Sequence, residues 1–210
     1  MGRVFVAPLG FHEDFVLRSL VKFKAMGGDA LYVVTCGPVV SAVKRAIDGL
    51  VAMTSRQGLP QPVLVELDCN NFYSSVGRLR ELLRKHLEDD VVFCVGGGLR
   101  VLTLVVLLAL VSLKKPFTLH YEPEGGVNEF TVEPEFFLNL FEELDEAERR
   151  VLSVVVLNPG VSVGEIARTL GIKEKTVRNI VTKLKKRGLV VKRGRREGVE
   201  PTVIAKALFS

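Results

Sequence analysis

The 210-residue sequence predicts an α/β domain built on a mostly parallel sheet, followed by a smaller unit of helices and a β-hairpin. Apolar, β-branched runs alternate with segments of helical period through the first hundred residues. The last third instead carries paired capping residues and turn glycines at short intervals. Charge divides at the same place, because residues 145–210 hold 15 Lys/Arg against 7 Asp/Glu whereas residues 1–144 hold 14 against 17. Two domains of different character are therefore expected.

The strands of the first domain are its short apolar runs. Between them, apolar residues recur with helical spacing, which predicts helices over about 12–26, 40–50 and 76–87. This alternation predicts a parallel sheet with right-handed crossovers and helices on its faces. The four strands are expected at Val4–Ala7, Leu31–Thr35, Val63–Leu67 and Val91–Val95.

A β-hairpin and a linker follow. Phe117–Glu122 is predicted as a fifth strand, and Glu129–Glu133, after the Gly125–Gly126 turn, as its hairpin partner. Pro134–Leu144 has the apolar spacing of an amphipathic connecting helix. The expected organisation is thus an N-terminal domain over residues 1–133, a connecting helix over 134–144 and a C-terminal domain over 145–210.

The helix expected at Leu99–Leu113 is apolar nearly all round. Its apolar run is too short to span a membrane, so we expect a buried helix. A helix that covers one face of a sheet normally keeps a polar stripe toward solvent, which makes a partner subunit the candidate cover for its other side. We therefore expect a homodimer, and we expect no association with a membrane.

Composition, the N-terminal sequence and the cysteines narrow the class of protein further. With 48% apolar residues and a mean hydropathy of +0.28, the chain can form a substantial core and is not expected to be disordered. The N-terminus has no signal-peptide pattern, and Cys36, Cys69 and Cys94 are far apart, without a CxxC pair or the spacing of a metal site. The cysteines are expected to be reduced, small buried residues of a cytoplasmic protein, and no metal or cofactor is expected.

Helix boundaries in the C-terminal domain are well marked. Asp145 with Glu148 has the spacing of a capping box, and Ser162 with Glu165 repeats it. Gly171 supplies the stop of the second helix, and a third helix is expected over about 173–187. Two short helices around a tight glycine turn are the pattern of a helix-turn-helix.

The third helix separates its residues into two faces. Val177, Ile180, Val181 and Leu184 fall on one side at about 100° per residue, and basic and amide side chains fall on the other. Such a helix can pack on a core while lying in the major groove of double-stranded DNA. The predicted DNA-binding residues of this helix are Lys175, Arg178, Asn179, Thr182, Lys183 and Lys186.

A β-hairpin after the third helix is the predicted wing. Its strands are expected at Leu189–Arg193 and Thr202–Phe209, with a polar loop between them. The basic tip is placed for phosphate contact or minor-groove entry. Residues 145–210 together resemble the winged helix-turn-helix domains of transcriptional regulators. The alternative is a winged domain that contacts another protein. The net positive charge of residues 145–210 disfavours this alternative. The tip residues are Arg193, Arg195 and Arg196.

Two glycine-containing loops follow strands at the edge where parallel sheets bind ligands. One is Pro8–Asp14, and the other is Gly96–Arg100, with three glycines before a helix. Open backbone N–H groups, the helix N-terminus and Arg100 could hold an anion; alternatively, the glycines only make a tight strand–helix turn. NAD and ATP are disfavoured, because Val101 stands where a dinucleotide motif needs a small residue and no Walker sequence is present.

These two loops, combined with a C-terminal winged helix, resemble the motifs of CARF-domain regulators of CRISPR systems. The resemblance covers essentially the whole chain and is strongest to the archaeal type. The resemblance implies a Rossmann-like fold and a homodimer. It also implies a cyclic oligoadenylate ligand, typically the tetramer, bound across the two-fold axis. The ligand-binding residues that it implies here are Leu9, Gly10, Phe11, Gly96, Gly97, Gly98 and Arg100.

The sequence therefore leads to the hypothesis of a ligand-responsive DNA-binding transcription regulator in CRISPR antiviral defence, as activator or repressor. Two alternatives stay open: a regulator that senses another small anion, and a ring nuclease. Some CARF domains cleave their ligand, and His12, Glu13 and Asp14 lie in the first loop. His12 is expected to have a structural role, and no catalytic residue is assigned.

Overall fold

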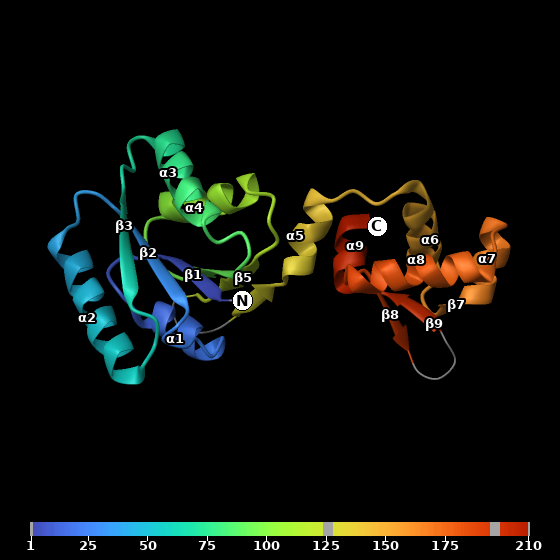
Figure 1. Ribbon diagram of the computed structural model, residues 1–210, viewed down its shortest axis with the longest axis horizontal. Coiled ribbons are helices and arrows are strands. Elements are labelled where there is room, and N and C mark those ends of the chain that lie inside the picture. Colours follow the sequence, from blue (N-terminus) through green and yellow to red (C-terminus); the bar gives the residue numbers. More distant parts are fainter. Residues whose placement is uncertain (1, 124–127, 194–197, 210) are drawn as a thin grey trace. The chain divides into compact units, whose positions relative to one another are not determined.

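The computed structural model describes residues 2–123, 128–193 and 198–209 (Figure 1). The chain divides into two compact units, Met1–Pro134 and Glu135–Ser210. The first contains a mostly parallel sheet with helices, and the second contains helices and a small antiparallel sheet. The fold class expected from the sequence is thereby confirmed.

The first unit is built on one sheet, whose strands within the described residues follow the order β3-β2-β1-β4-β5-β6. The first five strands pair in parallel, and β6 pairs antiparallel with β5, as the predicted hairpin requires. The Gly125–Gly126 turn lies outside the described residues. The strands are β1 (Arg3–Pro8), β2 (Ala30–Cys36), β3 (Pro62–Leu67), β4 (Asp90–Val95), β5 (Thr118–Tyr121) and β6 (Phe130–Val132).

The strand order reverses between β1 and β4. From β1 the chain extends the sheet through β2 to β3, and from β4 it extends the other side through β5. The loops after β1 and β4 thus leave neighbouring strand ends and run in opposite directions. In parallel sheets such a switch point leaves a crevice at the carboxyl ends of the two strands.

Helices cover both faces of the sheet: α1 and α2 lie on one face, and α3 and α4 lie together on the other (Figure 1). The two-residue alternation of β1 explains this arrangement, because Phe5 and Ala7 point into a core that also holds Leu20 of α1 and Leu50 of α2. The helices are α1 (Asp14–Lys22), α2 (Ser41–Gln57), α3 (Phe72–Arg84) and α4 (Arg100–Ser112).

All three helices predicted from apolar spacing have other boundaries in the structure, and α2 continues to Gln57 where about 40–50 is predicted. The first ends at Lys22, and Lys24 beyond it has a φ of +51°, a left-handed conformation that no helix continues through. α3 begins at Phe72, because the side chain of Asn71 accepts a hydrogen bond from the backbone N of Ser74 at 3.3 Å and caps the helix. Apolar periodicity marks the buried turns of a helix but not its ends.

The second unit has the expected helix-turn-helix. Both predicted capping boxes are formed: Asp145 with Glu148 and Ser162 with Glu165. Gly171 ends α7 with a φ of +66°. The elements are α5 (Pro134–Phe141), α6 (Glu146–Leu157), β7 (Val161–Ser162), α7 (Val163–Leu170), α8 (Glu174–Lys186), β8 (Val190–Arg193), β9 (Gly198–Pro201) and α9 (Val203–Phe209).

The return strand of the wing lies earlier than predicted. Gly198–Pro201 pairs with Val190–Arg193, whereas Thr202–Phe209, predicted as a strand, forms the helix α9 after Thr202. Thr202 Oγ1 accepts from the backbone N of Ala205 at 3.2 Å, and Ala205 is fully buried. β-branched residues at the start of this segment favour a strand, but the cap and the packing of one apolar face override that preference. The sequence pattern also does not predict the short strand β7.

The connecting helix α5 is fastened to the end of α8. Asn139 Nδ2 donates to the backbone O of Arg187 at 3.0 Å, and its Oδ1 accepts from Arg187 Nε at 3.0 Å. The same guanidinium donates to the backbone O of Glu142 and of Glu143, just beyond α5, and lies 3.7 Å from Glu148 Oε2. One arginine thus satisfies the carboxyl end of α5 and a buried carboxylate of α6.

Arg187→Ala is expected to lower the free energy of unfolding of the second unit by about 2–4 kcal/mol, because Asn139 and Glu148 lose a partner while they stay buried. Chemical denaturation of the full chain, followed by circular dichroism, measures the change. Lys185→Ala is the matched control, since it removes an exposed charge from the same helix and should cost less than about 0.5 kcal/mol. Equal losses in the two variants would contradict this account.

Candidate functional site

The loops after β1 and β4 meet at a cavity of about 720 Å³. The parallel pairing of β1 with β4 brings the two loops together at the carboxyl edge of the sheet. Leu9 is buried in the wall, and Phe11 stands at the cavity with 63% of its surface exposed. Arg100 opens α4, is exposed and lies outside the residues that line the cavity. The predicted ligand residues in the wall are Leu9, Gly10, Phe11, Gly96, Gly97 and Gly98.

The glycines let the two loops approach each other closely. A Cβ built on Gly10 would lie 2.9 Å from the backbone N and Cα of Gly98, and Gly98 itself has a φ of +80°. The ring of Phe15 occupies the space that a side chain on Gly96 or Gly97 would need. These glycines therefore have a packing role, whatever the cavity binds.

Gly10→Ala is expected to destabilise the first unit by about 1–3 kcal/mol, because the new methyl group would overlap the backbone of Gly98. Thermal unfolding of the full chain measures the effect. Gly77→Ala is the control: nothing lies within 4 Å of a Cβ at this exposed position inside α3. Removing a helical glycine should stabilise the protein by about 0.5–1 kcal/mol. The same sign of change in both variants would argue against the close contact.

Other elements complete the cavity wall. Thr35 and Cys36 end β2, and the rule that parallel sheets bind ligands at the carboxyl ends of their strands could have identified them. Arg18 of α1 and Pro123 after β5 also line the wall, but no sequence spacing connects them with the glycine loops. The remaining wall residues are His12, Asp14, Phe15, Pro38, Val40, Val43, Leu99 and Leu102.

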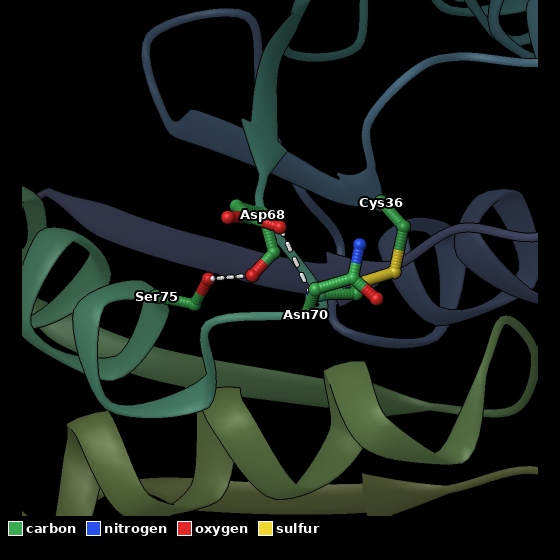
Figure 2. The surroundings of a disulfide bond; sticks show 5 residues. Cys36, Asp68, Asn70 and Ser75 are labelled. Carbon is green, nitrogen blue, oxygen red and sulfur yellow. Dashed lines mark hydrogen bonds between the residues drawn. A yellow bond between two sulfur atoms is a disulfide. The ribbon is translucent and has the colours of Figure 1, made fainter.

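A disulfide joins Cys36, at the cavity, to Cys69 in the loop after β3 (Figure 2). The expectation that all three cysteines are reduced is therefore wrong for this pair and holds for Cys94, which is buried with a free thiol. The two residues are 33 positions apart, but β2 and β3 pair in parallel with Cys36 opposite Leu67, which brings the Cα atoms to 5.4 Å. Hydrogen bonds to Asp68 from Asn70 N (3.0 Å) and Ser75 Oγ (2.8 Å) order the same loop.

Thiol counting tests this pairing. In denaturant without reductant, one thiol per chain should react with a maleimide, and three should react after reduction, as measured by mass spectrometry. In the folded protein Cys94 should react slowly, because burial shields it and raises the pKa of its thiol to about 12, so that little thiolate exists at neutral pH. Cys94→Ser should leave no reactive thiol before reduction. Three reactive thiols without reductant would overturn the pairing.

The predicted DNA-binding residues of α8 lie on an exposed face opposite the buried side of the helix. Two of them also interact with acids: Lys183 Nζ lies 3.7 Å from Glu148 Oε1, and Arg178 Nη2 lies 3.4 Å from Glu174 Oε2. Thr182 Oγ1 donates to the backbone O of Arg178 at 2.8 Å. The centre of the face is formed by Lys175, Asn179, Thr182 and Lys186.

Most of the basic tip of the wing lies outside the residues that the structure describes. Arg195 and Arg196 lie outside the described residues, and Arg193 is placed by its backbone alone, opposite Gly198. Across the described ranges, no group of three or more His, Cys, Asp or Glu side chains could hold a metal ion. Within those ranges no helix has the length and apolar character to cross a membrane.

Fold and site together define a two-domain protein: a Rossmann-like sheet with a cavity at its switch point, and a winged helix-turn-helix. Residues 3–133 match the Csa3 CRISPR-associated Rossmann-like domain, and residues 144–198 match the MarR family. The chain belongs to the Csa3 family of CRISPR-associated proteins, with a MarR-type winged helix-turn-helix at its C-terminus.

A relative in Saccharolobus solfataricus, named "CRISPR locus-related putative DNA-binding protein Csa3", is 28% identical over 202 residues, which are 93% of this chain and 83% of the relative. Among solved structures, Can2 from Sulfobacillus thermosulfidooxidans in complex with cyclic tetra-adenylate is similar with a TM-score of 0.44 and 9% identity over 99% of this chain. Csm6 from Enterococcus italicus, bound to cyclic hexa-2'-fluoro-hexa-dAMP, has a TM-score of 0.47 and 13% identity over 90% of this chain. The matches cover 63% of the Can2 chain and 52% of the Csm6 chain.

Proposed function

We propose that the protein is a ligand-responsive, DNA-binding transcription regulator of a CRISPR system, which senses a cyclic oligoadenylate, most simply cyclic tetra-adenylate. The observation that carries the proposal is the cavity at the β1–β4 switch point. It is lined by the two loops that resemble the ligand loops of CARF domains. It belongs to a chain whose other unit is a winged helix-turn-helix.

In this proposal the ligand lies against Leu9, Gly10 and Phe11 of one loop and the glycines of the other. The exposed ring of Phe11 suits stacking on an adenine base. Backbone N–H groups at the start of α4 suit an anionic phosphate, and Arg100 in the first turn of this helix adds a positive charge nearby.

A homodimer would complete the site. The cavity, at about 720 Å³, is within the usual range for one drug-sized ligand, and a ring of four nucleotides exceeds that size. Leu99, Leu104 and Leu108 expose 56%, 53% and 43% of their surfaces at and along α4, beside the cavity loop. We therefore propose that a second copy covers this apolar face and shares the ligand across the two-fold axis.

The proposed output is DNA binding by α8. Its central face of Lys175, Asn179, Thr182 and Lys186 would enter the major groove, flanked by Arg178 and Lys183. In the wing, Arg193, Arg195 and Arg196 would contact the backbone or the minor groove. Two winged units in a dimer would read a two-fold-related operator.

Coupling of ligand binding to DNA binding requires that the ligand prefers one arrangement of the dimer, and by linkage DNA must then change the affinity for the ligand by the same factor.

A second function is supported by one observation: His12 and Asp14 line the cavity, where they could assist cleavage of a bound cyclic oligoadenylate. In-line positioning of a ribose 2′-hydroxyl is the main need of such a ring nuclease.

A gel shift tests the proposal. On DNA selected from a random pool by the wild-type protein, saturating cyclic tetra-adenylate should change the apparent Kd by about fivefold or more. The double variant Lys175→Ala, Asn179→Ala should not shift DNA but should remain a dimer and bind the ligand as tightly as the wild type. An unchanged Kd at saturating ligand would reject the regulator. Rapid formation of linear oligoadenylate would favour the nuclease.

A further inference from the structure

Arg18 is a charged group of the cavity wall that the sequence did not single out. It lies in the second turn of α1, and its side chain is 53% exposed. Among the described residues that line the cavity it is the one lysine or arginine, since Arg100 lies outside that set. The first unit, residues 1–134, has no net charge, with 14 Lys/Arg against 14 Asp/Glu, so an anion in the cavity depends on local donors.

Glu122 holds this arginine. Arg18 Nε donates to Glu122 Oε1, and the Glu122 side chain is only 7% exposed. Glu122 directly follows β5, and its backbone N donates to the backbone O of Val95, the last residue of β4, at 2.7 Å. The backbone that carries this carboxylate is therefore fixed to the sheet edge that bears the glycine loop.

The geometry leaves the rest of the guanidinium available. Of the described residues, Glu122 is the one hydrogen-bonding partner of the Arg18 side chain, and it uses Nε. Two terminal amino groups remain, and a planar guanidinium matches a pair of phosphate oxygens. His120 adds no competing charge: its side chain is buried, its Nε2 lies 3.9 Å from Glu122 Oε2, and burial lowers the pKa of the imidazole.

We propose that Arg18 is the anion receptor of the cavity, donating its two terminal amino groups to a ligand phosphate, and that Glu122 is the positioning residue that fixes Arg18 through Nε. The inference rests on the proposed function for the identity of the ligand, but it applies to any phosphate in the cavity. Because the pair already restricts the long side chain, less conformational entropy is lost when the ligand binds.

The two partners of this ion pair are expected to respond differently to mutation. Arg18→Ala removes the receptor, and Arg18→Lys keeps the charge but cannot serve Glu122 and a phosphate with a planar fork. Glu122→Gln keeps an oxygen that accepts from Nε while it removes a negative charge next to the cavity. Glu122→Ala removes the anchor. Lys22→Ala is the matched control, because Lys22 lies one turn further along α1, pairs with Glu129 at 2.8 Å and does not line the cavity.

Isothermal titration calorimetry of the full-length protein, with cyclic tetra-adenylate and separately with inorganic tripolyphosphate, tests the assignment. We expect Arg18→Ala to bind about tenfold or more weakly, and Arg18→Lys and Glu122→Ala to lie between it and the wild type. Glu122→Gln should bind at least as tightly as the wild type, and Lys22→Ala should stay within about twofold of it. Thermal unfolding identifies any variant that is not folded. If an alanine variant fails to fold, the affinity of Glu122→Gln decides between a role of the ion pair in binding and a role in the fold alone.

Wild-type affinity in folded Arg18→Ala would overturn the assignment. So would equal losses in Arg18→Ala and Glu122→Gln, because the ion pair would then only support the fold. Tripolyphosphate binding that depends on Arg18, without binding of cyclic tetra-adenylate, would reject the proposed ligand and keep the role of Arg18. Failure of the wild-type protein to bind either anion would overturn the role of Arg18 itself.

Discussion

The parallel pairing of β1 with β4 is the constraint on which the rest of the first unit depends. Because the chain extends the sheet in opposite directions from these two strands, no crossover helix fills the space above their carboxyl ends. The two following loops meet there instead, close enough that Gly10 and Gly98 have no room for side chains. The cavity is a direct consequence of this strand order, and its glycines are a consequence of the close approach.

The same sheet edge organises the polar part of the cavity wall. β5 pairs beside β4 with Val95 opposite Tyr121, so Glu122 emerges next to the second glycine loop. Its carboxylate meets Arg18 of α1, a helix that starts from the first loop. Three segments distant in the sequence thus converge at one edge. A unit without a net positive charge can in this way present a fixed positive group where an anion would lie.

The second unit depends on local signals to a greater degree. Its capping boxes and the glycine after α7 each involve residues within a few positions, and all form as the spacing predicts. The two faces of α8 follow from its 3.6-residue period. What ties these helices to the connecting helix is non-local, since Asn139 and Arg187 are 48 positions apart and bond reciprocally. α5 is thereby part of the winged unit in structure, although it begins at Pro134, the last residue of the first unit.

The sequence by itself determined the alternation of strands and helices, the caps, the two glycine loops and the basic face of α8. Each of these follows from the spacing of residues within about a dozen positions, through local propensity and periodicity. Only the tertiary structure decided that Cys36 meets Cys69, that Arg18 meets Glu122 and that Val203–Phe209 is a helix. Strand order and packing against distant elements bring those groups together, and neither leaves a periodic pattern in the chain.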